Sequence, residues 1–260
     1  MNEPLDFSGR AVLVTGGSRG IGKGIAEAFL AAGAKVAVCG RKKPDVLPSM
    51  DGRTAVFVSA DVRDPEQVEK MVEQVVAELG RIDVLVNNAG GAPFTDAATA
   101  SPRFSEKIIQ LNLTAALHCA QQVNRVMQGQ DSGGCIINIA SVSGVRPSPG
   151  TAAYGAAKAG LINLSATLAI EWAPKVRVNS IAAGLIRTEQ AHLHYGNDEG
   201  IARVAETVPL KRLGTPEDVA GACLYFASPL AAYVSGANLL LHGGGETPAF
   251  LSAASVNRGD

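Results

Sequence analysis

Tyr154 and Lys158 stand four residues apart in an alanine-rich segment. On a helix, positions i and i+4 are neighbours, so both side chains would project from one face. A free phenol titrates near pH ~10 and is almost fully protonated in a cell. A fixed positive charge beside it lowers its pKa, towards the range where general acid/base catalysis works best. Alone, so short a pattern more often marks the rim of an ordinary amphipathic helix, so its meaning depends on the rest of the chain.

A glycine-rich turn, Thr15-Gly-Gly-Ser-Arg-Gly-Ile-Gly22, lies near the N-terminus. The apolar residues 11–14 before it indicate a buried strand, and residues 21–30 after it follow a helical period. Strand, glycine turn and helix N-terminus together form an anion site, because the backbone can approach a phosphate and the free N–H groups favour its charge. The spacing Gly-x-x-x-Gly-x-Gly differs from the more common Gly-x-Gly-x-x-Gly fingerprint. Such a turn can also be purely structural.

Further short motifs follow these two features in a fixed order. Together they resemble the short-chain dehydrogenase/reductase family in its compact single-domain, 3-oxoacyl reductase-like form, from about Phe7 to Gly244. Besides the glycine turn and the Tyr/Lys pair, the motifs are Asp61-Val62, Asn87-Asn-Ala-Gly90, Asn112, Ser141, Arg212-Leu-Gly-Thr-Pro-Glu-Asp-Val219 and Val234-Ser-Gly-Ala-Asn238. Each motif is short, but their order and spacing make the resemblance specific.

Length and composition agree with one globular domain. The chain has 260 residues, of which 47% are hydrophobic and 18% charged, unlike a disordered chain. The net charge is −1, and the longest basic run is only residues 41–43. The chain therefore lacks the positive charge that would attract nucleic acid or an anionic membrane. The N-terminus does not resemble a signal peptide, no apolar run approaches the ~20 residues of a membrane span, and the four scattered cysteines indicate free thiols. We therefore expect a soluble, cytoplasmic protein.

Strand and helix patterns alternate along the chain, with no linker. Strands are expected near 10–15, 34–39, 54–60, 82–87, 133–140, 175–182 and 236–242, and helices near 20–32, 65–79, 102–128, 151–173 and 215–227. Such alternation predicts an α/β, Rossmann-type fold, with a doubly wound, mostly parallel seven-stranded sheet and helices on both faces. We expect residues 1–260 to form one dinucleotide-binding and catalytic domain. Residues 187–210 resemble the mobile substrate lid of the family, and 247–260 form a small polar tail that either frays or packs on a neighbouring subunit.

The resemblance implies a role for each residue at the reacting end of the site. Ser141 would hydrogen-bond the substrate oxygen, and Tyr154 would protonate that oxygen as hydride arrives from the nicotinamide, or deprotonate it in reverse. Lys158 would lower the tyrosine pKa and hold the nicotinamide ribose. Asn112 would interrupt its helix and hold a water that links Lys158 to solvent. These roles imply an NAD(P)-dependent oxidoreductase (EC 1.1.1.-) acting on a small-molecule carbonyl or secondary alcohol. No metal is expected, because no His/Cys/carboxylate cluster has convincing ligand spacing.

The end of the second expected strand indicates which dinucleotide binds. An NAD-specific site has a carboxylate there that accepts a hydrogen bond from the ribose 2′-OH. In this family the carboxylate would fall at Gly40, which has none. Arg41 follows at once, and Arg19 points to the same region, so two guanidinium groups would hold a 2′-phosphate. NADP(H) is therefore preferred, with NAD(H) as the alternative if the basic residues form only a solvated loop. Asp61 would accept from the adenine amino group, and Asn88 would line the adenosine ribose. The full expected cofactor set is Gly16, Ser18, Arg19, Gly20, Ile21, Arg41, Asp61, Val62, Asn88, Ala89, Gly90, Tyr154, Lys158, Gly184, Ile186 and Thr188.

Two alternative functions and one departure from the family pattern accompany this prediction. Enoyl-thioester reductases often space their Tyr and Lys more widely than here. Non-catalytic dinucleotide-sensing regulators usually lose the Ser, Tyr or Lys that this chain keeps. The departure is Ala183-Gly184, where the family usually has Pro-Gly. A lost proline frees one φ angle and restores an N–H, which puts the nicotinamide affinity in doubt.

The helices expected over 102–128 and 151–173 are apolar on more than one side. A helix that is apolar nearly all round must be buried on a second face. The resemblance implies that these helices pair across a two-fold axis, with a second axis near the last strand. A homotetramer is therefore expected, with a dimer as the fallback.

Overall fold

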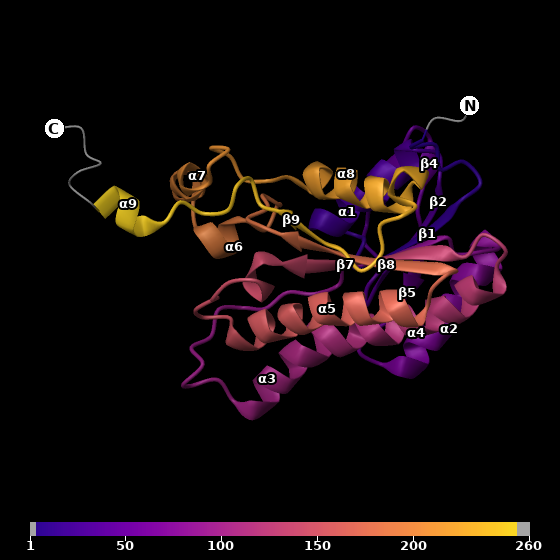
Figure 1. Cartoon of the computed structure of the whole chain (residues 1–260), viewed down its shortest axis with the longest axis horizontal. Coiled ribbons are helices and arrows are strands. Elements are labelled where there is room, and N and C mark those ends of the chain that lie inside the picture. Colours follow the sequence, from indigo (N-terminus) through magenta and orange to yellow (C-terminus); the bar gives the residue numbers. More distant parts are fainter. Residues whose placement is uncertain (1–3, 254–260) are drawn as a thin grey trace.

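The computed structural model describes residues 4–253, which fold around one parallel β-sheet (Figure 1). Seven strands lie in the order β5-β2-β1-β6-β7-β8-β9. Their bounds are Ala11–Thr15 (β1), Lys35–Gly40 (β2), Val56–Ser59 (β5), Val84–Asn87 (β6), Gly134–Ser141 (β7), Val176–Ala183 (β8) and Asn238–Leu241 (β9). The strand order reverses between β1 and β6, which is where a doubly wound sheet binds its ligand. The predicted Rossmann-type α/β fold is confirmed.

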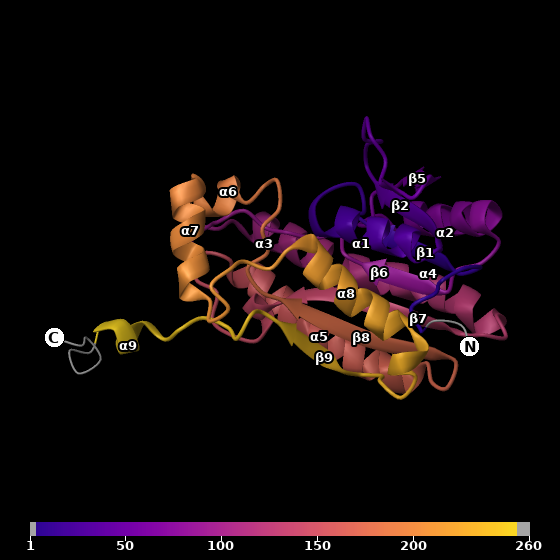
Figure 2. The same cartoon turned by 90° about the horizontal axis from the view of Figure 1, so that it is seen from above.

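Helices cover both faces of this sheet (Figure 1 and Figure 2). One face carries α1 (Gly20–Ala31) and α8 (Pro216–Ala227), and the other carries α2 (Pro65–Leu79), α4 (Ala115–Gly129) and α5 (Ala152–Glu171). Within residues 4–253, no helix has the length and apolar character needed to cross a bilayer.

The strand sequences explain why both faces are covered. Side chains alternate between the two faces of a strand, and in β1 Ala11 and Leu13 join the hydrophobic core under α2, α4 and α5. Val12 and Val14 join the separate core under α1 and α8. All five β1 residues are buried, and the first four, 11–14, are a continuous apolar run and not an alternating pattern, as expected for a parallel sheet.

Three α-helices of the described residues, α2, α3 and α8, begin with the same sequence pattern. Asp64, Ser101 and Thr215 each cap a helix N-terminus with a side-chain oxygen, and a proline follows each of them. The cap satisfies N–H groups that the helix leaves free, and proline costs nothing at the first helical position. At α8, Asp218 also accepts from the Thr215 N–H at 2.8 Å, which completes a capping box.

The structure adds elements that the sequence patterns did not show. The helix expected over 102–128 is divided into α3 (Pro102–Ile109), a π-helical turn (Gln110–Thr114) and α4. A two-stranded ribbon joins β3 (Ser49–Met50) to β4 (Arg53–Thr54). Residues 187–210 contain α6 (His192–Tyr195) and α7 (Asp198–Thr207), and α9 (Ala249–Ala253) lies near the C-terminus. Short 3₁₀ turns span Val142–Gly144 and Pro229–Ala231.

The 187–210 segment has its own small core. Ala191, Ile201 and Val208 are buried against Leu213, with Tyr195 packed on them. This cluster lies apart from the two main cores, beyond one end of the sheet in both views (Figure 1 and Figure 2). The predicted tail, 247–260, falls partly outside the described residues. Its described part forms α9, which stands away from the rest of the fold.

Candidate active site

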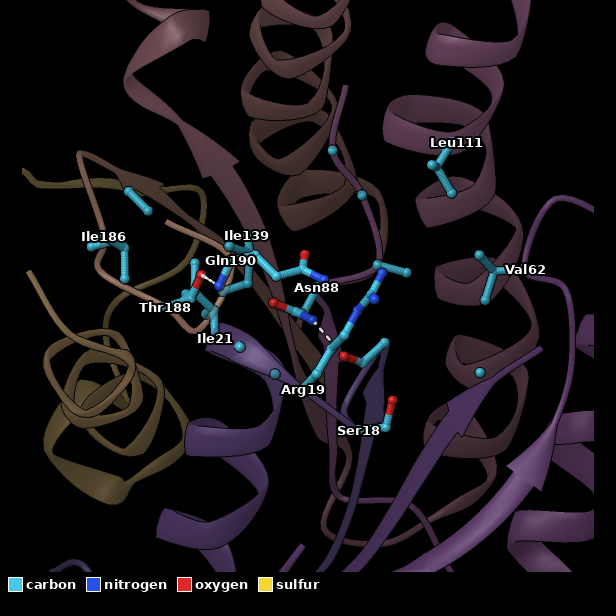
Figure 3. A pocket seen from close by; sticks show the side chains of 18 of the residues that line it. Ser18, Arg19, Ile21, Val62, Asn88, Leu111, Ile139, Ile186, Thr188 and Gln190 are labelled. Carbon is cyan, nitrogen blue, oxygen red and sulfur yellow. Dashed lines mark hydrogen bonds between the residues drawn. The ribbon is translucent and has the colours of Figure 1, made fainter. Parts of the chain in front are cut away.

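A cavity of about 1000 Å³ opens along the carboxyl ends of the central strands. Every residue that the sequence predicts to contact a cofactor lines it, and so does Ser141. Figure 3 shows part of this lining, with Ser18, Arg19 and Asn88 among the labelled residues. Asn112 is the one predicted site residue that lies behind the cavity wall and not in it. Residues that lie between Gly16 and Tyr195 in the sequence therefore meet at one place.

The glycine turn forms the floor beneath the N-terminus of α1. Gly16 and Gly20 have φ angles of +63° and +53°, in the left-handed region that favours glycine. A Cβ atom on Gly17 would lie 2.6 Å from a methyl carbon of Val38, so no side chain fits between the turn and β2. The turn therefore lies tight against β2, and Gly16, Ser18, Arg19 and Gly20 line the cavity.

Thr15 and Asn88 brace this turn from the neighbouring strands. The Thr15 hydroxyl accepts from the backbone N–H groups of Asn88 and Ala89, both at 3.0 Å. In return, the Asn88 side-chain Nδ2 donates to the Thr15 and Gly16 carbonyls at 2.9 and 3.2 Å. The Asn88 Nδ2 is thus committed to the turn, although Asn88 lines the cavity as predicted. Thr15 was not predicted as a site residue, although a polar residue closing an apolar strand is a visible signal.

The Asp61 end of the cavity contains an ion pair that the sequence analysis missed. Arg63 donates from Nε to Asp61 Oδ1 at 2.9 Å and from Nη2 to Oδ2 at 2.5 Å. This hydrogen bonding holds the pKa of the Asp61 carboxyl below its ordinary value, so Asp61 is a carboxylate at neutral pH. Arg63 also lines the cavity. The available signal was its place two residues after Asp61 in the same loop.

The end of β2 presents positive charge and no carboxylate. Gly40, Arg41 and Lys42 line the cavity, as does Arg19 from the glycine turn, and Figure 3 shows the Arg19 side chain pointing into it. Both arginines are exposed. Within residues 4–253, neither has a carboxylate within ion-pair distance. This end of the cavity is therefore suited to an anionic group.

Tyr154, Lys158 and Ser141 lie together at the other end. The Lys158 Nζ lies 5.6 Å from the centre of the Tyr154 ring and donates to the Ile139 carbonyl at 2.7 Å. Lys158 is only 4% exposed, and burial lowers its pKa to about 8. The Ser141 hydroxyl accepts from the Ser143 N–H at 3.1 Å, at the point where β7 ends.

The pKa of Tyr154 shifts against our expectation. We expected Lys158 to lower it, but burial raises it, and the hydrogen bond with Ser141 opposes that rise only in part. The reason is that the free-energy cost of burying a phenolate exceeds the stabilisation that its neighbours provide. The Lys158 ammonium donates a hydrogen bond to the backbone carbonyl of Ile139. Tyr154 is therefore protonated at neutral pH.

Asn112 holds the loop that follows β6. It sits in the π-helical turn, where an extra residue per turn exposes backbone groups and often marks a functional site. Its Oδ1 accepts from the Gly91 N–H at 2.8 Å, and its Nδ2 donates to the Gly91 and Ile108 carbonyls at 3.0 and 2.9 Å. The expected local interruption of the helix is confirmed, and the predicted water-holding role stays a prediction. A Cβ atom on Gly90 would lie 2.6 Å from Asn112 Oδ1 and 3.3 Å from Lys158 Nζ.

The segment after β8 is held by glycines on both sides. Gly184 donates to the Leu241 carbonyl at 2.8 Å, and a Cβ on it would lie 2.8 Å from two carbons of His242. Ile186 forms a parallel bridge with Gly214. The Arg212–Val219 motif therefore fixes Ile186 and the neighbouring Thr188 at the cavity, and Ala183 ends β8 with 5% exposure.

The 187–210 segment supplies further lining residues that the sequence analysis did not name. Glu189, Gln190, His194 and Tyr195 all border the cavity. Burial raises the pKa of Tyr195, and the neighbouring charge of Glu246 and the phenol of Tyr154 add to this. Within residues 4–253, no group of His, Cys, Asp and Glu is arranged to hold a metal ion.

Comparison with known proteins identifies the family. A family model described as Enoyl-(Acyl carrier protein) reductase matches residues 16–246. A crystal structure of a short-chain type dehydrogenase/reductase from Mycobacterium marinum is 35% identical, with a TM-score of 0.84, and the match covers 94% of this chain and 98% of that one. The chain belongs to the short-chain dehydrogenase/reductase family. The resemblance inferred from the motifs is confirmed.

Other members of this family are similar over most of the chain. The 3-oxoacyl-[acyl-carrier-protein] reductase FabG of Escherichia coli (strain K12) is 37% identical, across 92% of this chain and 98% of that protein. A 3alpha-hydroxysteroid dehydrogenase of Mediterraneibacter gnavus is 34% identical, across 90% of this chain and 96% of that protein. As a short-chain dehydrogenase/reductase, this protein is an oxidoreductase of a family that binds NAD(P)(H) and acts on small molecules.

Proposed function

We propose that this short-chain dehydrogenase/reductase transfers hydride between NADP(H) and a carbonyl or secondary alcohol, with Tyr154 as general acid/base. The observation that carries the proposal is the grouping of Tyr154, Lys158 and Ser141 at one end of a cavity whose other end presents Arg19 and Arg41. The names of the Escherichia coli and Mediterraneibacter gnavus relatives, a 3-oxoacyl reductase and a 3α-hydroxysteroid dehydrogenase, describe this chemistry for those proteins.

The residues present fit NADP(H), a dinucleotide that carries a diphosphate and a 2′-phosphate. The glycine turn places the N-terminus of α1 at the cavity, where its N–H groups and dipole favour a phosphate. Gly90 leaves open a space beside Asn112 and Lys158 that a Cβ atom would fill. Arg19 and Arg41 offer guanidinium groups where a 2′-phosphate would require them. Asp61, Val62, Ala89, Gly184, Ile186 and Thr188 complete the lining.

The chain's own groups then have defined tasks. Bound NADPH supplies the hydride. Ser141 donates a hydrogen bond to the substrate oxygen, and Tyr154 gives that oxygen its phenolic proton, which suits a group held protonated by burial. Lys158 is a buried cation beside the Tyr154 ring, so it stabilises the phenolate that forms when the proton leaves. In the alcohol-oxidising direction the same groups run in reverse.

Enoyl-thioester reduction is the second candidate, because the matching family model carries that description. The four-residue spacing of Tyr154 and Lys158 on α5 favours carbonyl chemistry instead. A non-catalytic dinucleotide sensor is disfavoured, since the residues needed for turnover lie together. We also propose a homotetramer as the working assembly.

The test is a substrate screen that follows NADPH absorbance with ketones, 3-oxoacyl thioesters and enoyl thioesters. Turnover of a carbonyl compound, and its loss by at least ~10²-fold in Tyr154→Phe, is the expected result. The variant should still bind NADPH in a fluorescence titration, because Tyr154 contributes chemistry more than affinity. Turnover of enoyl thioesters alone would favour the second candidate, and near-wild-type ketone turnover by Tyr154→Phe would reject the tyrosine assignment.

A further inference from the structure

Glu189, distant from α1 in the sequence, binds the N-terminus of this helix. The backbone N–H of Gly20, the first residue of α1, donates to Glu189 Oε1 at 3.0 Å, across 169 residues of sequence. A Cβ atom on Gly20 would lie 3.5 Å from a methyl carbon of Thr188 and 3.9 Å from Glu189 Oε1. The 187–210 segment therefore rests directly on the glycine turn, inside the cavity that both of them line.

This carboxylate occupies a position built for an anion. The first N–H groups of a helix have no partner within the helix, and the helix dipole favours negative charge there. The α1 helix provides no anion of its own, because Arg19 makes no side-chain capping bond and the first turn contains no acidic residue. Among the hydrogen bonds of residues 4–253, the contact with Glu189 is the one that brings a charged acceptor to this helix end. Its Oε1 accepts from a helix-terminal N–H, the kind of donor that binds phosphate.

The position of Glu189 also connects it to the reacting end of the cavity. The Ala191 N–H donates to the Thr188 carbonyl at 3.0 Å, and the Tyr195 N–H donates to Ala191 at 2.9 Å. The His192 ring Nδ1 lies 3.1 Å from the Glu189 carbonyl oxygen. Glu189 is thus tied through α6 to Tyr195, which lines the cavity with Tyr154. A movement of the Glu189 backbone away from α1 would therefore move this short helix too.

We propose that Glu189 is a built-in competitor for the diphosphate of the dinucleotide. Its carboxylate holds the anion position at the N-terminus of α1 before cofactor binds, and it must leave when cofactor arrives. Cofactor binding therefore repositions the 187–210 segment and, with it, the wall of the substrate end. This inference rests on the proposed function, because it assumes that a dinucleotide binds here.

The test compares cofactor affinity in Glu189→Gln, Glu189→Ala and wild type by calorimetric titration with NADPH. The dissociation constant should fall by at least ~3-fold in both variants, because a charge that competes with the diphosphate is gone. Glu199→Gln is the matched control. It makes the same charge change in the same segment, but Glu199 pairs with Arg203 on α7, so it should leave the constant unchanged.

A second ligand, 2′-AMP, makes the result specific, because it carries the 2′-phosphate but no diphosphate. Its affinity should be the same in wild type and in Glu189→Gln. Hydrogen exchange provides an independent readout: without cofactor, amides of 187–195 should exchange faster in Glu189→Gln than in wild type, and NADPH should remove the difference.

The outcomes separate this inference from the proposed function. If NADPH binds wild type and Glu189→Gln equally, or binds the variant more weakly, Glu189 supports the site or is neutral, and the inference is overturned. An equal gain in affinity for 2′-AMP would also overturn it. The substitution would then act through the overall electrostatic potential of the cavity and not through competition with the diphosphate. If wild type binds no NADPH at all, the proposed function fails first.

Discussion

The ammonium nitrogen of Lys158 donates a hydrogen bond of 2.7 Å to the backbone carbonyl of Ile139. Ile139 lies in β7, the strand that ends at Ser141. One strand thus positions both the Ser141 hydroxyl and the cation beside the Tyr154 ring. The arrangement places a positive charge in a buried position. Burying this charge has a free-energy cost, which lowers the pKa of Lys158 to about 8.

That cost predicts a pH dependence of stability. The pKa of this lysine is 10.5 in the unfolded chain and about 8 in the folded protein, so between these values the unfolded state binds more protons and stability rises with pH. The shift corresponds to about 3 kcal/mol. Lys158→Met lacks this dependence. Its stability advantage over wild type, measured by urea unfolding, should therefore be largest below about pH 8 and shrink by about 3 kcal/mol towards about pH 10.5. A difference that does not vary with pH would contradict the assignment.

The space at Gly90 makes a second prediction. In Gly90→Ala the new methyl group would lie 2.6 Å from Asn112 Oδ1 and 3.3 Å from Lys158 Nζ. Overpacking of this kind costs ~1–3 kcal/mol and should pull Asn112 from Gly91, so both the free energy of unfolding and NADPH affinity should fall. Gly221→Ala, in α8, is the control: a Cβ there meets no atom within 4 Å, and the helix should gain ~0.5–1 kcal/mol. Unchanged NADPH affinity in Gly90→Ala would contradict the placement of cofactor beside Asn112.

The sheet and the membership of the site were predictable from sequence. Buried parallel strands are near-continuous apolar runs, and each of the seven expected strands is found within two residues of its expected start. Parallel strands carry their carboxyl ends to one edge, so Thr15, Asn87 and Ser141, although far apart in the chain, end their strands at one place. The order of the motifs along the chain was therefore enough to predict which residues line the cavity.

Contacts that depend on packing were not predictable. The pKa of Tyr154 shifts upward because of burial, and spacing on a helix does not reveal burial. The Arg63–Asp61 pair depends on the conformation of one loop. The contact between Glu189 and Gly20 depends on how the 187–210 segment folds over the glycine turn. The helices α6 and α7 are short, so their periods were too weak to separate them from a loop.

The proposed preference for NADP(H) over NAD(H) predicts that a single substitution can reverse the relative affinities for the two cofactors. Wild type should bind NADPH more tightly than NADH by over ~1.5–3 kcal/mol, the worth of charge-assisted hydrogen bonds, and Arg41→Ala should shrink that gap mainly by weakening NADPH. Gly40→Asp should reverse it, because a Cβ on Gly40 meets its nearest neighbour, the Phe57 ring, at 3.7 Å, so a carboxylate fits. Lys43→Ala, an exposed neighbour outside the cavity lining, is the control. Equal dissociation constants for NADPH and NADH in wild type would refute the preference.

Exposed apolar side chains on the last strand predict the assembly. Leu239 and Leu240 of β9 are 38% and 48% exposed, and Ile170 at the end of α5 is 82% exposed. β9 is an edge strand of the sheet, and an edge with apolar side chains needs a cover to avoid aggregation. Light scattering should therefore give a mass of four 26.7 kDa chains, consistent with dihedral symmetry. Leu240→Glu should reduce it to a dimer, because it places a charge in the contact across β9, whereas Leu193→Glu, on exposed α6, should not. A wild-type mass close to 26.7 kDa at micromolar concentration would show that these side chains have no partner in solution.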